Sequence, residues 1–299
     1  MTQPAPLRAL LGGLVDYAGL FPPASLGMPE AVARYAAYHA GEHRQLLGRF
    51  VLPAARLDEF SVASSHAAMS NGQTAAARRA WRLSVLAGPA DAERLQAFNA
   101  WEEERAVIDT IEAKADSPEA VREIAQALGG AFTVFVEVPV RTDPAPMLAA
   151  LRTHGLRAKI RTGGVTTDAF PNPEEVLRFL STCAALDLPF KATAGLHHPL
   201  RGEYPLTYAA GSECGTMYGF LNVFLASLLL RKGVPAAEVA PVLEERDAAA
   251  IVVTEDGIRW RSRRLTLQDV AEARASFAGS FGSCSFEEPV QDLTSLRLI

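Results

Sequence analysis

The chain has 299 residues, of which 49% are apolar and 21% charged, and its formal net charge is −5. This balance is that of a globular protein and excludes a chain that is disordered throughout. The length allows one large domain or two small ones, with a core that needs no disulfide or structural metal. Acidic and basic residues are interleaved and no basic run occurs, so we expect no nucleic-acid partner.

The cysteines and the apolar segments indicate where the protein works. Cys183, Cys214 and Cys284 are sparse and lack CxxC spacing, which argues against a disulfide scaffold or a zinc site and favours a reducing cytoplasm. The N-terminal stretch has one arginine and contains Asp16, unlike a secretory signal. The longest apolar block, residues 218–230, is shorter than a membrane span of about 20 residues. We expect a cytoplasmic protein with no membrane partner, in which this block is a buried helix or a homo-oligomer contact.

Short apolar or β-branched runs alternate along the chain with segments that carry helix start signals. Capping residues followed by proline, as in Ser117-Pro118 and Asn172-Pro173, mark such starts. Strand–helix alternation predicts a parallel sheet, and eight units over this length predict one (β/α)8 barrel of the TIM type. A doubly wound open sheet is the alternative, but its Gly-rich first turn is missing. The expected strands are residues 13–20, 47–52, 82–87, 107–113, 132–138, 158–161, 190–194 and 250–254.

Three segments depart from this alternation. Residues 199–216 follow the seventh strand without clear periodicity, which is typical of a lid-like functional loop. Asp256-Gly257, followed by alternating residues, predicts a β-hairpin appended near the C-terminus. Residues 283–299 form a mixed tail that we expect to pack across the barrel or against a partner. Because no Gly-, Ser- or Pro-rich linker divides the chain, residues 1–299 are predicted to form a single domain.

Basic residues end two neighbouring strands. In the sixth strand Lys159 and Arg161 share one face, while the intervening Ile160 suits the helix side. In the seventh strand Lys191 and Thr193 share the inward face by the same alternation. Function in TIM barrels gathers at the carboxyl ends of the strands. Two lysines and an arginine therefore meet in one barrel mouth, where they attract an anion or act as a nucleophile with a lowered pKa.

Glycines follow these cations. Gly163 and Gly164 come after the sixth strand and Gly195 after the seventh, and glycine lets the backbone approach a bound phosphate or carboxylate closely. The alternative is that the cations pair with barrel carboxylates as a structural network and that the glycines form ordinary turns.

Four acidic residues lie on expected strands: Asp16, Asp109, Glu112 and Glu137. Glu137 lies between two valines, so we expect it to face inward. Asp109 and Glu112 have opposite parity and cannot both face the lumen of a regular strand. Asp16 interrupts an apolar run, where a charge needs a partner or a function, although a turn residue is the alternative.

The pair His197-His198 follows the seventh strand. A divalent metal held by Asp16, Glu137 and one histidine is one hypothesis, but no HxH or HExxH spacing supports it. We instead expect His197 to act as a general acid or base and His198 to contact the substrate anion. Structural histidines at the barrel rim remain the alternative.

The two lysine segments resemble motifs of class I aldolases of the deoxyribose-phosphate aldolase type. Lys159-Ile160-Arg161-Thr162-Gly163 matches Lys-x-x-Thr-Gly on strand six, and residues 191–196 resemble Lys-Ala-Ser-x-Gly-Ile on strand seven. The resemblance implies that Lys159 forms a Schiff base, that Lys191 tunes it and that Asp109 serves a proton relay. It covers short stretches only, and Arg161 has no clear counterpart. The opening residues 16–23 and residues 190–199 instead resemble a bacterial barrel family without an established activity.

The sequence thus predicts a lyase or aldolase-like enzyme that acts on a small anionic carbonyl compound, a phosphate or carboxylate, without a cofactor. One alternative is a metal-dependent isomerase or lyase that uses a divalent metal at the barrel mouth. The other is a non-catalytic anion-binding barrel. The residues expected to act in catalysis are Lys159, Lys191, Glu137, Asp109 and His197, and those expected to bind the substrate are Arg161, Gly163, Gly164, Thr193, Gly195, His198 and Asp16.

Overall fold

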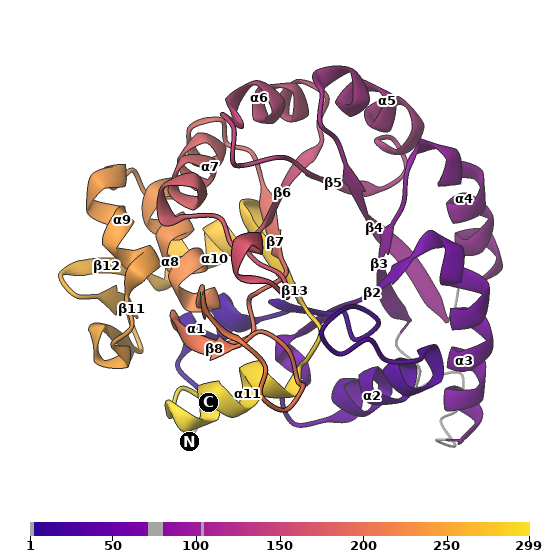
Figure 1. Cartoon of the computed structure of the whole chain (residues 1–299), viewed down its shortest axis with the longest axis horizontal. Coiled ribbons are helices and arrows are strands. Elements are labelled where there is room, and N and C mark those ends of the chain that lie inside the picture. Colours follow the sequence, from indigo (N-terminus) through magenta and orange to yellow (C-terminus); the bar gives the residue numbers. More distant parts are fainter. Residues whose placement is uncertain (1–2, 71–79, 103–104) are drawn as a thin grey trace.

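The barrel predicted from the sequence is present. The structure is a computed structural model that describes residues 3–70, 80–102 and 105–299. Eight parallel strands close in the order β1-β13-β7-β6-β5-β4-β3-β2 and helices surround them, which makes a (β/α)8 barrel of the TIM type (Figure 1). The barrel strands are β1 (Val15–Tyr17), β2 (Leu47–Pro53), β3 (Trp81–Leu86), β4 (Ala106–Lys114), β5 (Thr133–Glu137), β6 (Arg157–Arg161), β7 (Phe190–Thr193) and β13 (Ala278–Ser283).

The helices begin where the sequence signals place them. Ser117 accepts a hydrogen bond from the Ala120 N–H at the start of α5, and Asn172 and Glu175 form a reciprocal capping box at the start of α7. None of the helices in the described part of the chain has the length and hydropathy of a membrane span. The helices are α1 (Ala5–Leu11), α2 (Met28–Ala40), α3 (Leu57–Ser70), α4 (Ala92–Trp101), α5 (Pro118–Leu128), α6 (Ala145–Thr153), α7 (Pro173–Ala185), α8 (Phe220–Arg231), α9 (Ala236–Glu244), α10 (Leu267–Ser276) and α11 (Glu287–Ser295).

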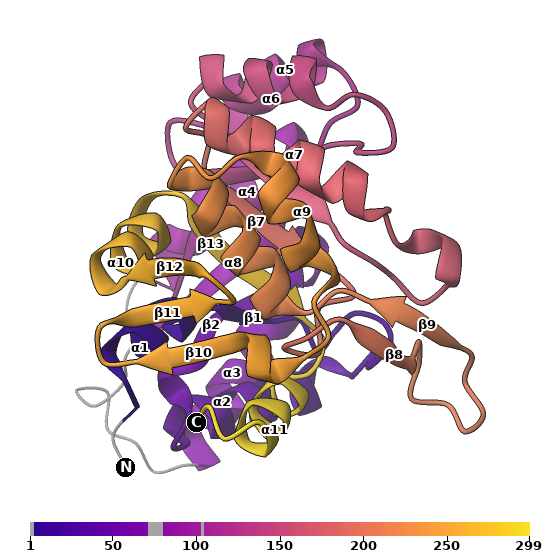
Figure 2. The same cartoon turned by 90° about the vertical axis from the view of Figure 1, so that its left-hand side faces the viewer.

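The eighth strand was predicted in the wrong place. Residues 250–254 contain β10 (Ile251–Thr254), which pairs antiparallel with β11 (Gly257–Trp260), and β11 pairs with β12 (Arg263–Thr266). This three-stranded sheet lies outside the barrel, as Figure 2 shows, and it contains the predicted hairpin. The barrel is closed instead by β13, whose sequence Ala-Gly-Ser-Phe-Gly-Ser has few of the residues that favour strands.

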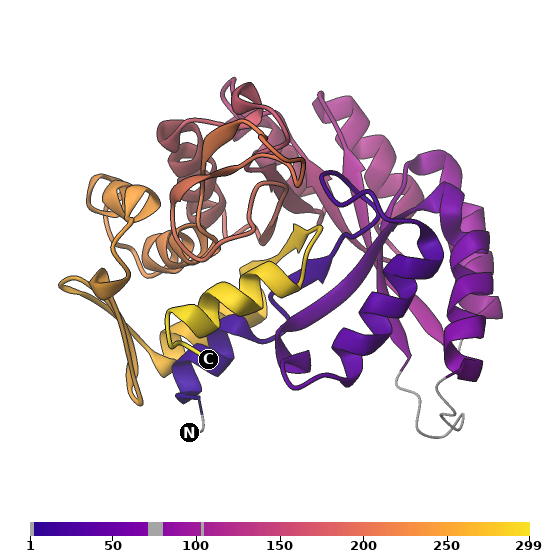
Figure 3. The ribbon, with the colours of Figure 1, turned by 60° about the horizontal axis from the view of Figure 1, so that its bottom comes forward.

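The lid-like loop and the C-terminal tail both contain regular structure. Within residues 199–216, β8 (Gly202–Pro205) begins an antiparallel pair with β9 (Cys214–Met217), and this pair projects from the barrel in Figure 2. Residues 283–299 contain α11, the yellow helix of Figure 3. Tyr38 of α2 donates a hydrogen bond to Glu287 of α11 over 3.2 Å, so this helix packs against the barrel's own outer layer.

The apolar core lies between the strands and the helices. Phe50 of β2 is fully buried against aromatic side chains of α2, α3 and β3. On the other side of β1, Phe281 of β13 stacks on Phe220 of α8, with 5.1 Å between ring centroids, and also contacts Phe224. Outward residues of the strands are therefore apolar, which leaves the polar residues of the same strands to fill the lumen.

Replacement of Phe281 tests the assignment of β13 as the closing strand. Phe281→Ala removes a fully buried ring and should lower the free energy of unfolding by about 3–5 kcal/mol, measured by urea denaturation. Trp101→Ala, at a side chain that is 81% exposed, is the control and should change it little. A loss below about 1 kcal/mol for Phe281→Ala would contradict the packing described for this strand.

Candidate active site in the barrel lumen

The two strand-end lysines face the lumen as predicted. β6 and β7 are in register with Lys159 opposite Lys191 and Ile160 opposite Ala192. Ile160 and Ala192 are fully buried on the outer face of the strands. The two lysines are 3% and 0% exposed, and each contacts a carboxylate of a strand that is not its immediate neighbour in the barrel. Alternation along the strands therefore gives the orientation expected from the sequence.

Acidic and basic side chains alternate through the lumen. Lys191 Nζ lies 2.8 Å from Asp16 Oδ2 and 2.5 Å from Glu112 Oε1. Lys159 Nζ lies 2.8 Å from Glu112 Oε2 and 3.0 Å from Glu137 Oε2. We call these five residues, Asp16, Lys191, Glu112, Lys159 and Glu137, the lumen network. It joins β1, β4, β5, β6 and β7, so cations expected to cluster are in fact separated by carboxylates.

Hydroxyl and backbone donors complete the coordination of the buried carboxylates. Ser84 Oγ donates to Glu112 Oε1 over 2.7 Å, and Ser280 Oγ donates to Asp16 Oδ2 over 2.5 Å. The backbone N–H of Arg49 donates to Asp16 Oδ1 over 2.7 Å. Asp16 and Glu112 thus have partners on both oxygens, which buried carboxylates require.

The network fixes the charge of its central members. Burial disfavours the ionised form of Glu112, but the attraction of Lys159 and Lys191 outweighs it and holds the pKa of Glu112 well below its usual range. Burial likewise opposes the charge of Lys191, but Asp16 and Glu112 raise the pKa of this lysine. Lys191 is therefore an ammonium group, and the expectation that neighbouring cations lower lysine pKa values is wrong for it.

Asp109 belongs to a different cluster. Its Oδ1 lies 2.5 Å from Arg49 Nε and its Oδ2 lies 2.5 Å from Arg82 Nε, and neither lysine of the lumen network contacts it. Burial opposes its charge, but Arg49 and Arg82 together outweigh burial and lower the pKa of Asp109. The strand-four carboxylate that meets both lysines is Glu112.

A register shift explains how one strand supplies both carboxylates. Leu83 pairs with Ile108, but Ser84 pairs with Thr110, so Asp109 is an extra residue in β4. Such a bulge changes which residues face one side of a sheet. The parity rule that separates Asp109 from Glu112 was stated for a regular strand, and β4 is not regular across this bulge.

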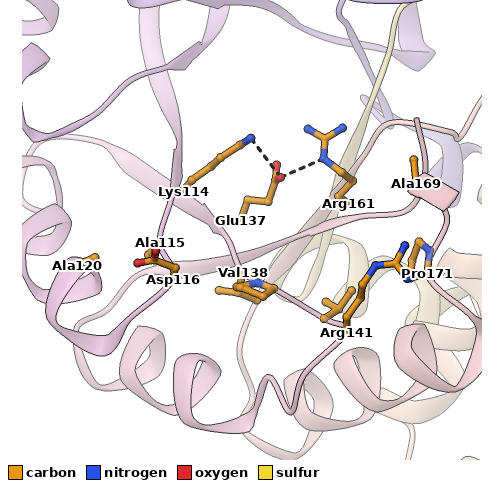
Figure 4. Close-up of a pocket in the computed structure, with 12 residues that line it drawn as sticks. Lys114, Ala115, Asp116, Ala120, Glu137, Val138, Arg141, Arg161, Ala169 and Pro171 are labelled. Atoms are coloured by element: carbon orange, nitrogen blue, oxygen red, sulfur yellow. Dashed lines mark hydrogen bonds and ion pairs between the residues drawn. The ribbon is translucent and has the colours of Figure 1, made fainter. Parts of the chain in front are cut away.

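The network reaches a pocket at the barrel mouth through Glu137. Glu137 Oε1 lies 3.1 Å from Arg161 Nε and 3.7 Å from Lys114 Nζ, and Figure 4 shows these three side chains converging. They line a pocket of about 560 Å³ together with Asp116 and Arg141. Burial opposes ionisation of Glu137, but Lys159 and then Arg161 lower its pKa. Glu137 therefore presents one oxygen to the lumen and the other to the pocket.

The glycines expected to approach a ligand instead approach each other. A Cβ at Gly163 would collide with Phe170 and lie 2.9 Å from the Cα of Gly195, whose φ is +71°. Gly164 similarly faces the Cβ of Ala169. The glycines let the loops after β6 and β7 pack together, and neither they nor Thr193 line the 560 Å³ pocket.

Both histidines pair with carboxylates of α11. His197 Nδ1 lies 3.3 Å from Glu288 Oε2, and His198 Nδ1 lies 2.6 Å from Asp292 Oδ2. The His198 ring also stacks on Tyr204, with 3.5 Å between centroids. Neither histidine contacts the lumen network, so the expected acid–base and substrate-binding histidines lie apart from the two lysines.

The hypothetical metal ligands are also held apart. Asp16 and Glu137 are bound to different lysines, and His197 lies beside Glu288. Within residues 3–70, 80–102 and 105–299, no three His, Cys, Asp or Glu side chains are arranged to hold a metal ion.

The sequence identifies Glu112 as an acidic residue of the fourth strand without assigning it a role, and it does not point to Ser84 or Lys114. Alternation in β4 carries a signal for Glu112 and Lys114, because these two residues share a face and the apolar residues of the other face, Ile111 and Ala113, are buried. The role of Ser84 depends on the pairing of β3 with β4, which the sequence does not display.

No family model, curated protein or solved structure matches this chain. The resemblance to class I aldolases therefore rests on the lysine motifs and on the barrel fold, which hosts many unrelated functions.

Replacement of Glu112 tests whether the lumen network stabilises the barrel. Glu112→Gln leaves two buried ammonium groups short of a counter-charge and should lower the free energy of unfolding at pH 7 by about 3–5 kcal/mol, measured by urea denaturation. Glu123→Gln, at an exposed position of α5, is the control. An unchanged midpoint for Glu112→Gln would show that the network does not hold the barrel together.

The contact between His197 and α11 predicts a pH-dependent stability. Burial lowers the pKa of His197, but hydrogen bonds to Cys284 and Glu288 outweigh burial and raise the pKa to about 9. Because the folded-state pKa is raised, the stabilisation is complete below about pH 6.5 and is lost as the pH rises through 9, with a magnitude on the order of 3 kcal/mol. Unfolding measured from pH 6 to 10 should show this loss in the wild type and in His154→Gln, an exposed control. His197→Gln should abolish it, and an identical pH profile for that variant would contradict the assignment.

Proposed function

We propose that this barrel is an aldolase-like lyase that forms a Schiff base between Lys159 and a small anionic carbonyl compound. The observation that carries the proposal is the position of Lys159: its ammonium group lies 3.0 Å from Glu137, and Glu137 lines the 560 Å³ pocket beside Arg161 and Lys114. The lysine is thus one side chain away from a cationic pocket at the carboxyl end of the barrel, where TIM-barrel enzymes act.

Proton transfer within the network would release the nucleophile. Lys159 gives its proton to Glu137, and its neutral amine attacks the carbonyl carbon of the substrate to form a carbinolamine. Glu137 returns the proton to the carbinolamine hydroxyl, which leaves as water and gives the protonated imine. Glu137, again a carboxylate, accepts the proton of the β-hydroxyl group as the Cα–Cβ bond breaks, and the fragment that carried this hydroxyl leaves as an aldehyde. The electron pair of the broken bond passes to the protonated imine and gives an enamine, whose Cα takes the proton back from Glu137. Water then hydrolyses the resulting imine, which releases the second product and restores Lys159.

Lys191 and Glu112 have supporting roles in this scheme. Lys191 stays protonated because Asp16 and Glu112 raise its pKa, so it is a positioning residue that holds Glu112 beside Lys159. Arg161 and Lys114 bind the phosphate or carboxylate of the substrate, since both cations are partly exposed in the pocket.

A non-catalytic anion-binding barrel is the second candidate. It is favoured by the pairing of each buried lysine with two carboxylates, an arrangement that also occurs in purely structural networks. In that case an anion binds Arg161 and Lys114 while Lys159 never reacts.

Borohydride trapping separates the two candidates. The low number of lysines lets each possible adduct be assigned to one residue. The chain has only four lysines: Lys114, Lys159, Lys191 and Lys232. We expect a panel of small phosphorylated aldehydes and keto acids, reduced with borohydride, to give one ligand-sized adduct on Lys159, located by intact mass and peptide mapping. The adduct should disappear in Lys159→Met.

Lys232→Met is the matched control, because Lys232 pairs with Asp269 away from the lumen network, and it should keep the adduct. An adduct that persists in Lys159→Met, or that spreads equally to Lys232, would refute the Schiff-base mechanism. Saturable stabilisation by the same anions without any adduct on Lys159 would favour the anion-binding barrel.

A further inference from the structure

A second pocket lies outside the lumen network. It has a volume of about 430 Å³ and is bounded by the loop that leads into α7 and by the β8–β9 pair. Phe170 and Asn172 form one wall, and Arg201, Cys214 and Tyr218 form the other. This pocket contains none of the residues assigned above to the Schiff-base chemistry.

Arg201 brings an uncompensated charge into this pocket. Its Nη1 atom is buried and has no hydrogen-bond partner. In the described part of the chain, no carboxylate forms an ion pair with Arg201. Its guanidinium carbon lies 4.6 Å from the centroid of the Tyr218 ring, a cation–π contact that orients the group without neutralising it. A buried N–H donor without an acceptor is costly, and the Arg201 side chain lines the pocket, where a bound anion would supply the missing negative charge.

The surroundings hold Arg201 in place before any ligand binds. Its backbone N–H donates to Asn222 Oδ1 over 2.8 Å. The Tyr218 hydroxyl donates to the carbonyl oxygen of Pro171 over 2.8 Å, which fixes the ring beneath the guanidinium. A preorganised group loses little conformational entropy on binding.

The acidic residue of the pocket does not neutralise Arg201. Glu203 accepts a hydrogen bond from Thr216 and lies 3.8 Å from Arg246, so its charge is shared with groups other than Arg201. The positive charge of Arg201 remains available to a ligand.

We propose that this pocket is a second binding site, in which Arg201 anchors the carboxylate or phosphate of a small organic anion. The planar fork of arginine matches both groups in a bidentate geometry. The rings of Phe170 and Tyr218 supply apolar surface for the remainder of the ligand. The site is independent of the Schiff-base mechanism and stands whether or not Lys159 reacts.

Cys214 provides a reporter for binding, because it is exposed and lines this pocket, whereas Cys183 and Cys284 are buried. The full chain is treated with iodoacetamide, an uncharged reagent, in the presence of inorganic phosphate or succinate, and alkylation of Cys214 is followed by peptide mapping. We expect saturable protection of Cys214 by at least one of the two anions, and none by sodium chloride at the same ionic strength. Protection by phosphate alone indicates a phosphorylated ligand, and protection by succinate alone indicates a carboxylate.

Arg201→Gln should lower the affinity for the protecting anion by about tenfold or more, since it removes a charge-assisted hydrogen bond. Arg201→Lys, which keeps the charge, should retain part of the protection. Arg152→Gln, at an exposed position of α6, is the matched control and should bind as the wild type does, with thermal unfolding used to verify that each variant is folded. Absence of protection by both anions in the wild type, or undiminished protection in Arg201→Gln, would overturn the proposal.

Discussion

Two ammonium groups buried in a barrel lumen require carboxylates at hydrogen-bond distance, because an unpaired charge in such a place costs several kcal/mol. Lys159 and Lys191 obtain these partners from three other strands, β1, β4 and β5. Each pairing also fixes which residue of a strand lies at a given height in the barrel. The network therefore constrains the architecture, because it fixes one register among strands whose outward faces are apolar. Through Glu137, which also pairs with Arg161, it extends to the pocket at the barrel mouth.

Seven of the eight strands were predictable because each is a short apolar run between recognisable turn and cap residues. The eighth was not, because β13 is built from small residues. Their size has a structural reason: a Cβ at Gly279 would lie 2.8 Å from the carbonyl oxygen of Phe190, so bulkier strand formers do not fit there. The segment 250–254 offered a stronger β-branched pattern and was chosen in its place, although its partners are antiparallel neighbours outside the barrel.

Part of the site was predictable by the same local rules. Alternation oriented Lys159, Lys191 and Glu137, since β5, β6 and β7 pair without interruption. Alternation did not predict the partners of those residues whose contacts depend on segments distant in the sequence. The shifted register of β4 relative to β3 brings Asp109 to the arginines and Glu112 to the lysines, and α11 supplies the carboxylates that engage His197 and His198. Neither feature has a local signal, and the catalytic roles of all these residues remain predictions.

The pairing of β1 with β13 has a consequence for how the chain folds. β1 lies between β13 and β2 in the closed barrel, and the partners of Asp16 include Lys191 and Ser280, which are 175 and 264 positions away in the sequence. Contacts of such separation form late, because the entropy of closing long loops must be overcome first. During synthesis the edge of β1 that pairs with β13 therefore stays unpaired until β13 has left the ribosome. The Asp16 carboxylate likewise has no ammonium partner until Lys191 has been made. This exposed edge is where premature pairing with another chain would begin.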